Sequence, residues 1–135
     1  MATLQKILGL VESEFGDKAK HFAAREFSMN ALEGAEYDRT KTGGVYVFVH
    51  EEFGVVKVGK SQSNASKRAR EHVRDNTQTK SGVKPQIQMR DFLSDPNCKL
   101  VVLNVDDSSN MHWILALEHF LEHKLNPCIR SVRNG

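Results

Sequence analysis

The feature that most constrains the fold of this chain is a change in the pattern of residue types near residue 45. Residues 45–49 read Val-Tyr-Val-Phe-Val, a β-branched and aromatic run that is typical of a strand. Residues 50–54 form a compact turn sequence, and residues 55–58 are a second run of the same kind. Two such runs joined by a short turn predict a β-hairpin, around which the rest of the chain must fold.

Helical patterns lie on both sides of this hairpin. The sequence predicts a third strand over residues 99–105 and helices over residues 3–15, 17–27, 66–73, 86–93 and about 110–124. Ser63 or Asn64 is expected to cap the third of these helices. Residues 28–43 and 75–84 are expected to be loops. The order predicts an α+β fold with a small sheet and helices around it.

Composition places the chain among soluble globular proteins. Its 135 residues are 39% apolar and 27% charged, with a net charge of +2, as is ordinary for a single soluble domain. Cys98 and Cys128 are too few and too far apart for a disulfide framework or a CxxC metal site, so we expect buried or inert thiols. The sequence contains neither a secretory signal nor an apolar run near the ~20 residues of a membrane span. We therefore expect a cytoplasmic protein without membrane contact.

The second run of the hairpin also matches a phosphate-loop motif. Residues 54–61, GVVKVGKS, fit G-x-x-x-x-G-K-[ST]. A phosphate loop needs an open turn whose backbone N–H groups face the anion, followed by a helix. Three of the four variable positions are valines, whose branching disfavours such a loop. A strand is therefore favoured, and a nucleotide-binding protein is the distant alternative.

Several short motifs follow one another in a recognisable order. Gly44-Val45-Tyr46 opens the first strand of the hairpin, and Lys57-Val58-Gly59 closes the second. The basic segment Lys67–His72 comes next, and Glu118 and Pro127 lie on and after the last helix. This order and spacing resemble the GIY-YIG nuclease family, with the two triplets in the places of GIY and YIG. The resemblance covers residues 42–130, about two thirds of the chain.

The resemblance implies both a fold and a division of the chain. It implies a small three-stranded antiparallel sheet flanked by helices over residues 42–135, preceded by an N-terminal helical extension over residues 1–41. Two positions depart from the family pattern. Lys57 replaces the second tyrosine, as in the branch of the family with a KIG-like triplet, and Arg130 stands about where the family has an asparagine.

The resemblance also implies a metal-dependent endonuclease that hydrolyses phosphodiester bonds, with DNA favoured over RNA. Glu118 would hold one Mg²⁺ or Mn²⁺ ion. Hydrolysis further requires a base for the attacking water and a cation on the developing phosphorane charge. We predict Tyr46 as the base, with Lys57 beside it favouring the phenolate. Arg68 would clamp the non-bridging oxygens, and His72 would relay or donate a proton.

A set of basic residues is predicted to follow the nucleic-acid backbone. They are Lys60, Lys67, Arg70, Arg74, Lys80, Lys84 and Arg130. A domain this small often needs a second copy or a partner protein to cut both strands. The alternative function is a nucleic-acid-binding module that keeps the fold and has lost the chemistry.

Each site residue also has a plain structural interpretation. Tyr46 can fill a sheet face, and Lys57 and Arg68 can be solvated charges. Glu118 lies at the border of the apolar stripe of the last helix, with Glu122 as its rival one turn later.

The last helix also carries a zinc-protease signature, because residues 119–123 fit H-x-x-E-H. That site needs a third protein ligand far downstream, and only twelve residues follow His123. We interpret His119 and His123 as mostly exposed side chains.

Overall fold

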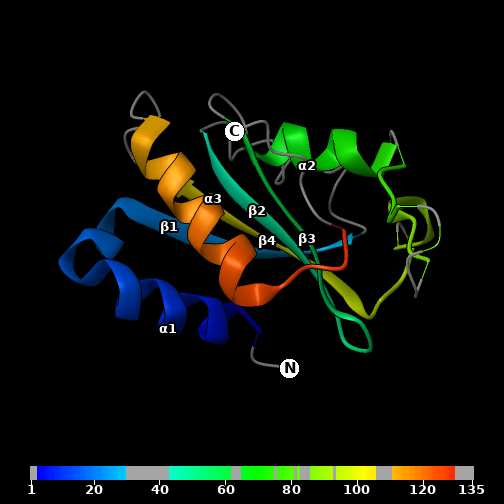
Figure 1. Cartoon of the computed structure of the whole chain (residues 1–135), viewed down its shortest axis with the longest axis horizontal. Helices are drawn as coiled ribbons and strands as arrows, with labels where there is room; N and C mark the ends of the chain where they lie inside the picture. The colour runs from blue at the N-terminus through cyan, green and yellow to red at the C-terminus, as the bar shows by residue number, and fades with distance from the viewer. Residues whose placement is uncertain are drawn as a thin grey trace.

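The computed structural model describes most of the chain: residues 3–29, 43–61, 65–74, 76–80, 82, 86–92, 94–105 and 111–129. The side chains of five of these residues lie outside the description: Thr3, Ser66, His72, Arg74 and Met111. The elements in chain order are α1 (Thr3–Phe15), η1 (Gly16–His21), β1 (Phe22–Ser28), β2 (Gly44–His50), β3 (Gly54–Ser61), α2 (Ala65–Arg74), η4 (Met89–Phe92), β4 (Cys98–Val105) and α3 (Met111–Leu125). The fold is α+β, as predicted (Figure 1).

The sheet has four strands in the order β1-β4-β2-β3, and every neighbouring pair is antiparallel. The predicted hairpin is confirmed as β2 and β3, and the third predicted strand is confirmed as β4. The first and last helices and the basic helix are also confirmed. The expected capping residues Ser63 and Asn64, and most of the expected loop over residues 28–43, lie outside the described residues.

The prediction of a three-stranded sheet was wrong, as was that of a helix over residues 17–27. Residues 22–28 form β1, which pairs with β4 from Phe22↔Val105 to Ser28↔Lys99. An extended backbone sends Phe22 into one core and Phe27 against the other. It also gives β4 a partner for backbone groups that would otherwise be unpaired in a buried strand. The weakly patterned helix over residues 86–93 is reduced to the short 3₁₀ helix η4.

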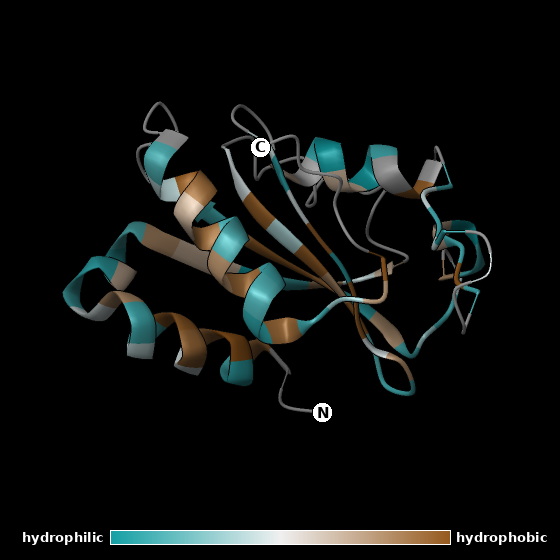
Figure 2. Ribbon diagram, viewed as in Figure 1, coloured by the Kyte–Doolittle hydropathy of each residue, from teal (hydrophilic) through white to brown (hydrophobic). Residues whose placement is uncertain are grey.

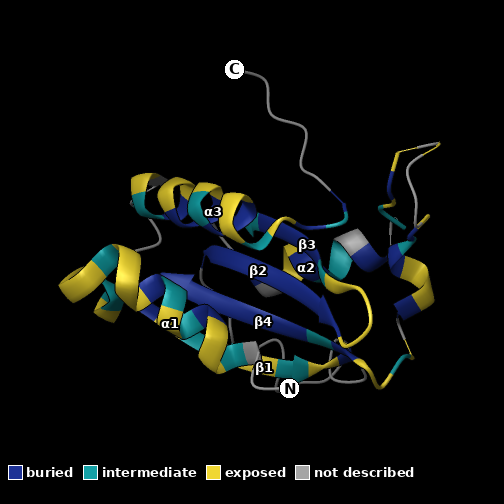
Figure 3. Cartoon of the chain, turned by 60° about the horizontal axis from the view of Figure 1, so that its bottom comes forward, coloured by how far each residue is buried: buried dark blue, intermediate teal, exposed yellow. Residues whose placement is uncertain are grey.

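The sheet is covered on both faces, and different helices cover each face. On the α1/α3 face, the buried side chains include Ile7, Val47, Val101, Leu103 and Leu117. On the α2 face, they include Tyr46, Phe48, Ala69, Phe92 and Leu100. Figure 3 shows β2 buried along its length and β4 along nearly all of it, whereas α3 is buried only on the side toward the sheet. Figure 2 shows the hydrophilic outer side of α2.

Aromatic side chains join α1 to the rest of the α1/α3 face. Gly16 has φ +57°, a left-handed conformation that ends α1 at low cost for glycine. The turn that follows brings Phe15 against Phe22 of β1, with ring centroids 5.2 Å apart, and against Phe120 of α3 at 5.7 Å. The N-terminal helix is therefore packed onto the sheet together with α3.

The strand β3 forms one edge of the sheet, and the chain after α3 covers part of that edge. The Ile129 N–H donates to the Val56 carbonyl at 2.8 Å, and Lys57 forms a parallel bridge with Ile129. The register between β2 and β3 shifts at Phe48, so that β3 carries one extra residue there. The described residues after α3 cover β3 as far as Lys57, two residues before Gly59.

Candidate active site

The two glycine-containing triplets meet through the side chain of Tyr46. Tyr46 on β2 is directly opposite Gly59 on β3 and has 0% exposure. A Cβ atom built on Gly59 would lie 2.3 Å from both Cζ and Oη of Tyr46. The ring therefore lies across β3 at Gly59, because only glycine has no Cβ atom to block it. This packing carries the phenol oxygen to the edge strand of the sheet.

Gly44, the first residue of the opening triplet, has a separate steric role. A Cβ atom there would lie 2.1 Å from the Leu103 carbonyl oxygen and 2.9 Å from the Asn104 Cα atom. Only glycine allows β2 to approach β4 this closely. The glycines of both triplets are thus explained by packing around Tyr46 and β4.

Lys57 is buried, with 4% exposure, and is not the solvated edge charge of the plain interpretation. Its partner across the sheet is Phe48, which packs on the α2 face. Residues opposite one another in an antiparallel pair share a face, so Lys57 and Tyr46 lie on the same face of the sheet. Buried ammonium groups are retained only when charges or hydrogen-bond acceptors compensate for the lost water.

Glu118 and Glu122 lie on one flank of α3, and both are buried, with exposures of 4% and 6%. Residues four apart on a helix share a face. The opposite flank carries Trp113 and Phe120, which contact Phe15 of α1. Because α3 packs mainly against β3, its acidic flank is on the side away from α1, toward the edge of the sheet. Glu118 is therefore neither solvent-exposed nor in the apolar centre of the core.

The helix α2 covers the face on which Tyr46 and Lys57 lie. Ala65, Ala69 and Val73 are its buried stripe. Arg68 stands beside that stripe, with 45% of its side chain exposed, and its Nη1 is 2.9 Å from Oε2 of Glu71. The His72 side chain is among those outside the description.

The residues predicted to follow a nucleic-acid backbone are distributed over two elements and a loop. Lys60 on β3 and Arg70 on α2 are half-buried, whereas Lys67 and Lys80 are exposed. Lys84, Arg130 and the Arg74 side chain lie outside the described residues. The described members therefore belong to β3, to α2 and to the segment after it.

The structure thus brings together some of the predicted site residues. Tyr46 and Gly59 are in contact, and Lys57 shares their face with α2, which carries Arg68. Glu118 comes from a helix that covers the other face, and it lies on the flank toward β3. Whether these side chains converge on one phosphate stays a prediction.

Comparisons with known proteins add no assignment: no family model, no curated protein and no solved structure matches this chain. Within the described residues, no group of three His, Cys, Asp or Glu side chains is arranged to hold a metal ion. His119 and His123 of the zinc-protease signature are exposed, as expected, and they line a shallow cavity with Glu14. Among the same residues, no helix combines the length and the apolar character needed to cross a bilayer.

Sequence reasoning missed a partly buried polar pair at the hairpin turn. His50 Nε2 is 2.8 Å from Asp95 Oδ2, and His50 Nδ1 accepts the Glu52 N–H at 3.0 Å. This arrangement places the proton on Nε2, which donates to Asp95. The pair joins residues 45 positions apart, so no local pattern could indicate it. Both ring nitrogens are engaged in holding the turn, which makes this a structural group.

The thiols are poor nucleophiles. Burial is the main cause that raises the pKa of Cys98 to about 12, and it also raises the pKa of Cys128. Both cysteines are free. This agrees with the expectation of buried or inert thiols.

Proposed function

We propose that this protein is a metal-dependent endonuclease that hydrolyses phosphodiester bonds, with DNA favoured over RNA. The observation that carries the proposal is the packing of Tyr46 across Gly59, which places a phenol oxygen at the edge strand. Lys57 lies on the same face, and Glu118 lies on the flank of α3 toward that strand. These are the residue types that phosphodiester hydrolysis requires.

Each side chain has a defined part in the proposed reaction. Tyr46 accepts a proton from the attacking water, and the Lys57 ammonium favours the phenolate form of Tyr46. Arg68 leaves its contact with Glu71 to pair with the non-bridging oxygens. His72 donates or relays a proton near the leaving oxygen.

Glu118 suits a hard divalent cation, because Mg²⁺ and Mn²⁺ prefer oxygen ligands. One ion held by a single carboxylate would take water and phosphate oxygens as its other ligands. The ion would neutralise charge on the leaving oxygen. Glu122, one turn away and equally buried, is the nearest rival on the same helix.

A binding module without catalysis is the second candidate function, and two observations favour it. Tyr46 has 0% exposure, and its ring fits against Gly59 as a packing element does. Arg68 is already paired with Glu71 at 2.9 Å. In this alternative the basic residues bind the backbone of a nucleic acid, and the two triplets serve the sheet alone. A phosphate-loop protein is disfavoured, because residues Gly54–Ser61 are the strand β3 along their whole length.

Glu118→Gln separates the two functions. Incubating the protein with Mg²⁺ or Mn²⁺ and plasmid, branched or single-stranded DNA, or RNA, should give cleavage products. The substitution keeps the size of the side chain and should lower cleavage by several orders of magnitude, since metal stabilisation of the transition state is worth several kcal/mol. Nucleic-acid binding should be unchanged or tighter.

Glu122→Gln is the matched control, because Glu122 has nearly the same burial on the same flank of α3. It should leave cleavage nearly intact. Equal losses in both variants would mean that a buried charge, and not a metal ligand, had been removed. Wild-type protein that cleaves none of these substrates would make the binding module the better account.

A further inference from the structure

A cavity of about 680 Å³ on the α1/α3 face is separate from the site described above. It lies between the first turns of α1, the tip of the β2–β3 hairpin and the end of α3. Its lining is mostly apolar and includes Ile7, Leu10, Val49, Phe53, Val55 and Leu125. A volume of this size and an apolar lining with few polar groups are typical of sites for small ligands.

The charges at this cavity have one sign. Lys6 of α1 and Lys124 of α3 belong to the lining, and the ten described residues that form it include no Asp or Glu. The two lysines are exposed and come from different elements. The negative end of the α3 helix dipole, at its C-terminus, repels an anion there, and the positive charge of Lys124 in the last turn offsets this repulsion.

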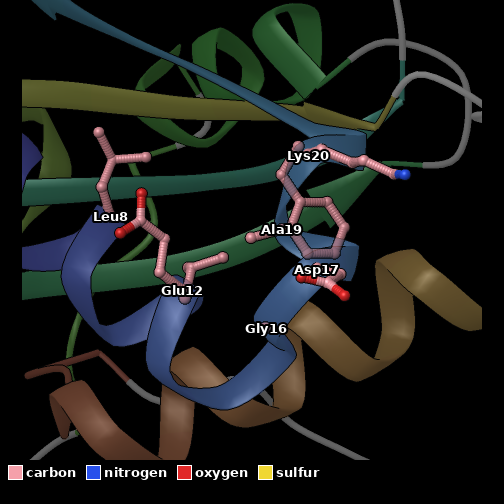
Figure 4. Close-up of a pocket in the computed structure, with 8 residues that line it drawn as sticks. Leu8, Glu12, Gly16, Asp17, Ala19 and Lys20 are labelled. Atoms are coloured by element: carbon pink, nitrogen blue, oxygen red, sulfur yellow. The ribbon is translucent and has the colours of Figure 1, made fainter.

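The cavity at the other end of α1 has a different charge pattern. Figure 4 shows that cavity, which lies between α1 and η1. Its lining includes the carboxylates of Glu12 and Asp17 together with Lys20. Charges of both signs at one opening do not select an anion.

The rim of the first cavity also carries an aromatic side chain that is exposed to solvent. Phe53 is 37% exposed, and its ring is held by His50 and Phe92, with centroids 4.9 Å and 6.1 Å away. These contacts fix the position of the exposed ring edge. An apolar ligand entering the cavity would cover it without reorganising the hairpin, and this lowers the cost of binding.

We propose that this cavity binds a medium-chain aliphatic carboxylate. The hydrocarbon chain packs against Leu10, Val55 and Leu125, and the carboxylate lies between Lys6 and Lys124. The apolar lining recognises the chain, and the paired lysines select an acid over an amine or an alcohol. The site is on the face of the sheet opposite Tyr46, so the proposal does not depend on the nuclease proposal.

Octanoate, octylammonium and octan-1-ol test the proposal as probes of equal chain length. In NMR titrations of the full chain, octanoate should shift the backbone amide signals of Leu10, Val55 and Asn126. We expect octanoate to bind about tenfold more tightly than octylammonium, because the two exposed lysines attract the carboxylate of octanoate and repel the ammonium group of octylammonium. Equal affinities, or shifts centred away from these residues, would overturn the proposal.

Two variants and a charge-matched control locate the recognition within the cavity. Lys6→Gln with Lys124→Gln should reduce the preference for octanoate to about twofold or less, since the ion pairs are gone. Lys18→Gln with Lys20→Gln makes the same change of net charge elsewhere and should keep the preference. Leu10→Trp should fill the cavity and abolish binding of all three probes, with thermal unfolding as the check on its fold. Octanoate affinity that survives both Leu10→Trp and the Lys6/Lys124 change would refute the assignment.

Discussion

Gly59→Ala tests the packing on which the candidate active site depends. The added Cβ would lie 2.3 Å from Cζ and Oη of Tyr46, and ordinary contact begins at 3.4 Å, so the ring must move by 3.4 − 2.3 = 1.1 Å or more. Tyr46 has 0% exposure, and the ring moves against a filled core. Overpacking of this kind costs about 1–3 kcal/mol. Alanine recovers about 0.5–1 kcal/mol relative to glycine in a strand.

The net expectation is a loss of about 1–2 kcal/mol in the free energy of unfolding. Urea unfolding followed by circular dichroism measures it, since the slope of such a transition allows differences of this size to be resolved. Gly9→Ala is the control, because a Cβ at that exposed helical position meets nothing within 4 Å. That change should stabilise the protein by about 0.5–1 kcal/mol.

A double substitution assigns the loss to the ring itself. In a Tyr46→Leu background the atoms that clash are absent, so Gly59→Ala should cost little. The coupling between the two positions should be about 1 kcal/mol or more. Gly59→Ala that leaves stability unchanged, or costs the same with and without the ring, would refute the inferred contact.

Two further predictions concern the basic face and the hairpin turn. Lys67→Glu with Arg70→Glu should weaken DNA binding for all sequences and should lower the slope of log affinity against log salt concentration by about 2 in magnitude. Unchanged affinity at low salt would place the DNA surface elsewhere. The Asn97 backbone N–H and the His50 ring hold the pKa of Asp95 below its usual value. A lowered pKa stabilises the fold above the unfolded-state pKa of about 3.9 and loses this effect as pH falls through the folded-state value. The stability difference between wild type and Asp95→Asn, from urea midpoints at pH 7 to 2.5, should therefore shrink below about pH 4; a constant difference would contradict this origin.

The parts of the fold that could be predicted are those with local patterns. The stripe of α1, the alternation of the hairpin and the apolar run of β4 each specify their structure within a few residues. Residues 22–27 were predicted to be helical because Phe22, Ala23 and Phe27 fit one helical stripe, whereas pairing with β4 decides their conformation. Each residue of β1 is more than 70 positions away from its partner in β4, so the local sequence carries no sign of the pairing.

The same distinction holds for the candidate site. Gly59 and Tyr46 were singled out through a resemblance, but the steric reason for the glycine required the register between β2 and β3. Lys57 lies beside the register shift at Phe48 and is bridged to Ile129 of the segment that covers the edge of β3. Neither feature is encoded in the local sequence around Lys57, which is why an exposed edge charge was the plain interpretation.

Burial sets the remaining condition for catalysis. Tyr46, Lys57 and Glu118 each have an exposure of 4% or less, so the proposed reaction requires that a phosphate gain access to them. Buried charged groups of this kind are seldom favourable for stability, and apolar residues of similar size often serve as well. Packing explains Gly44 and Gly59, whereas a buried lysine and two buried carboxylates on adjoining elements need charges or hydrogen bonds that compensate for the lost water. In the proposed function Tyr46, Lys57 and Glu118 serve binding or chemistry, and access to the β3 edge is what the cleavage assay tests first.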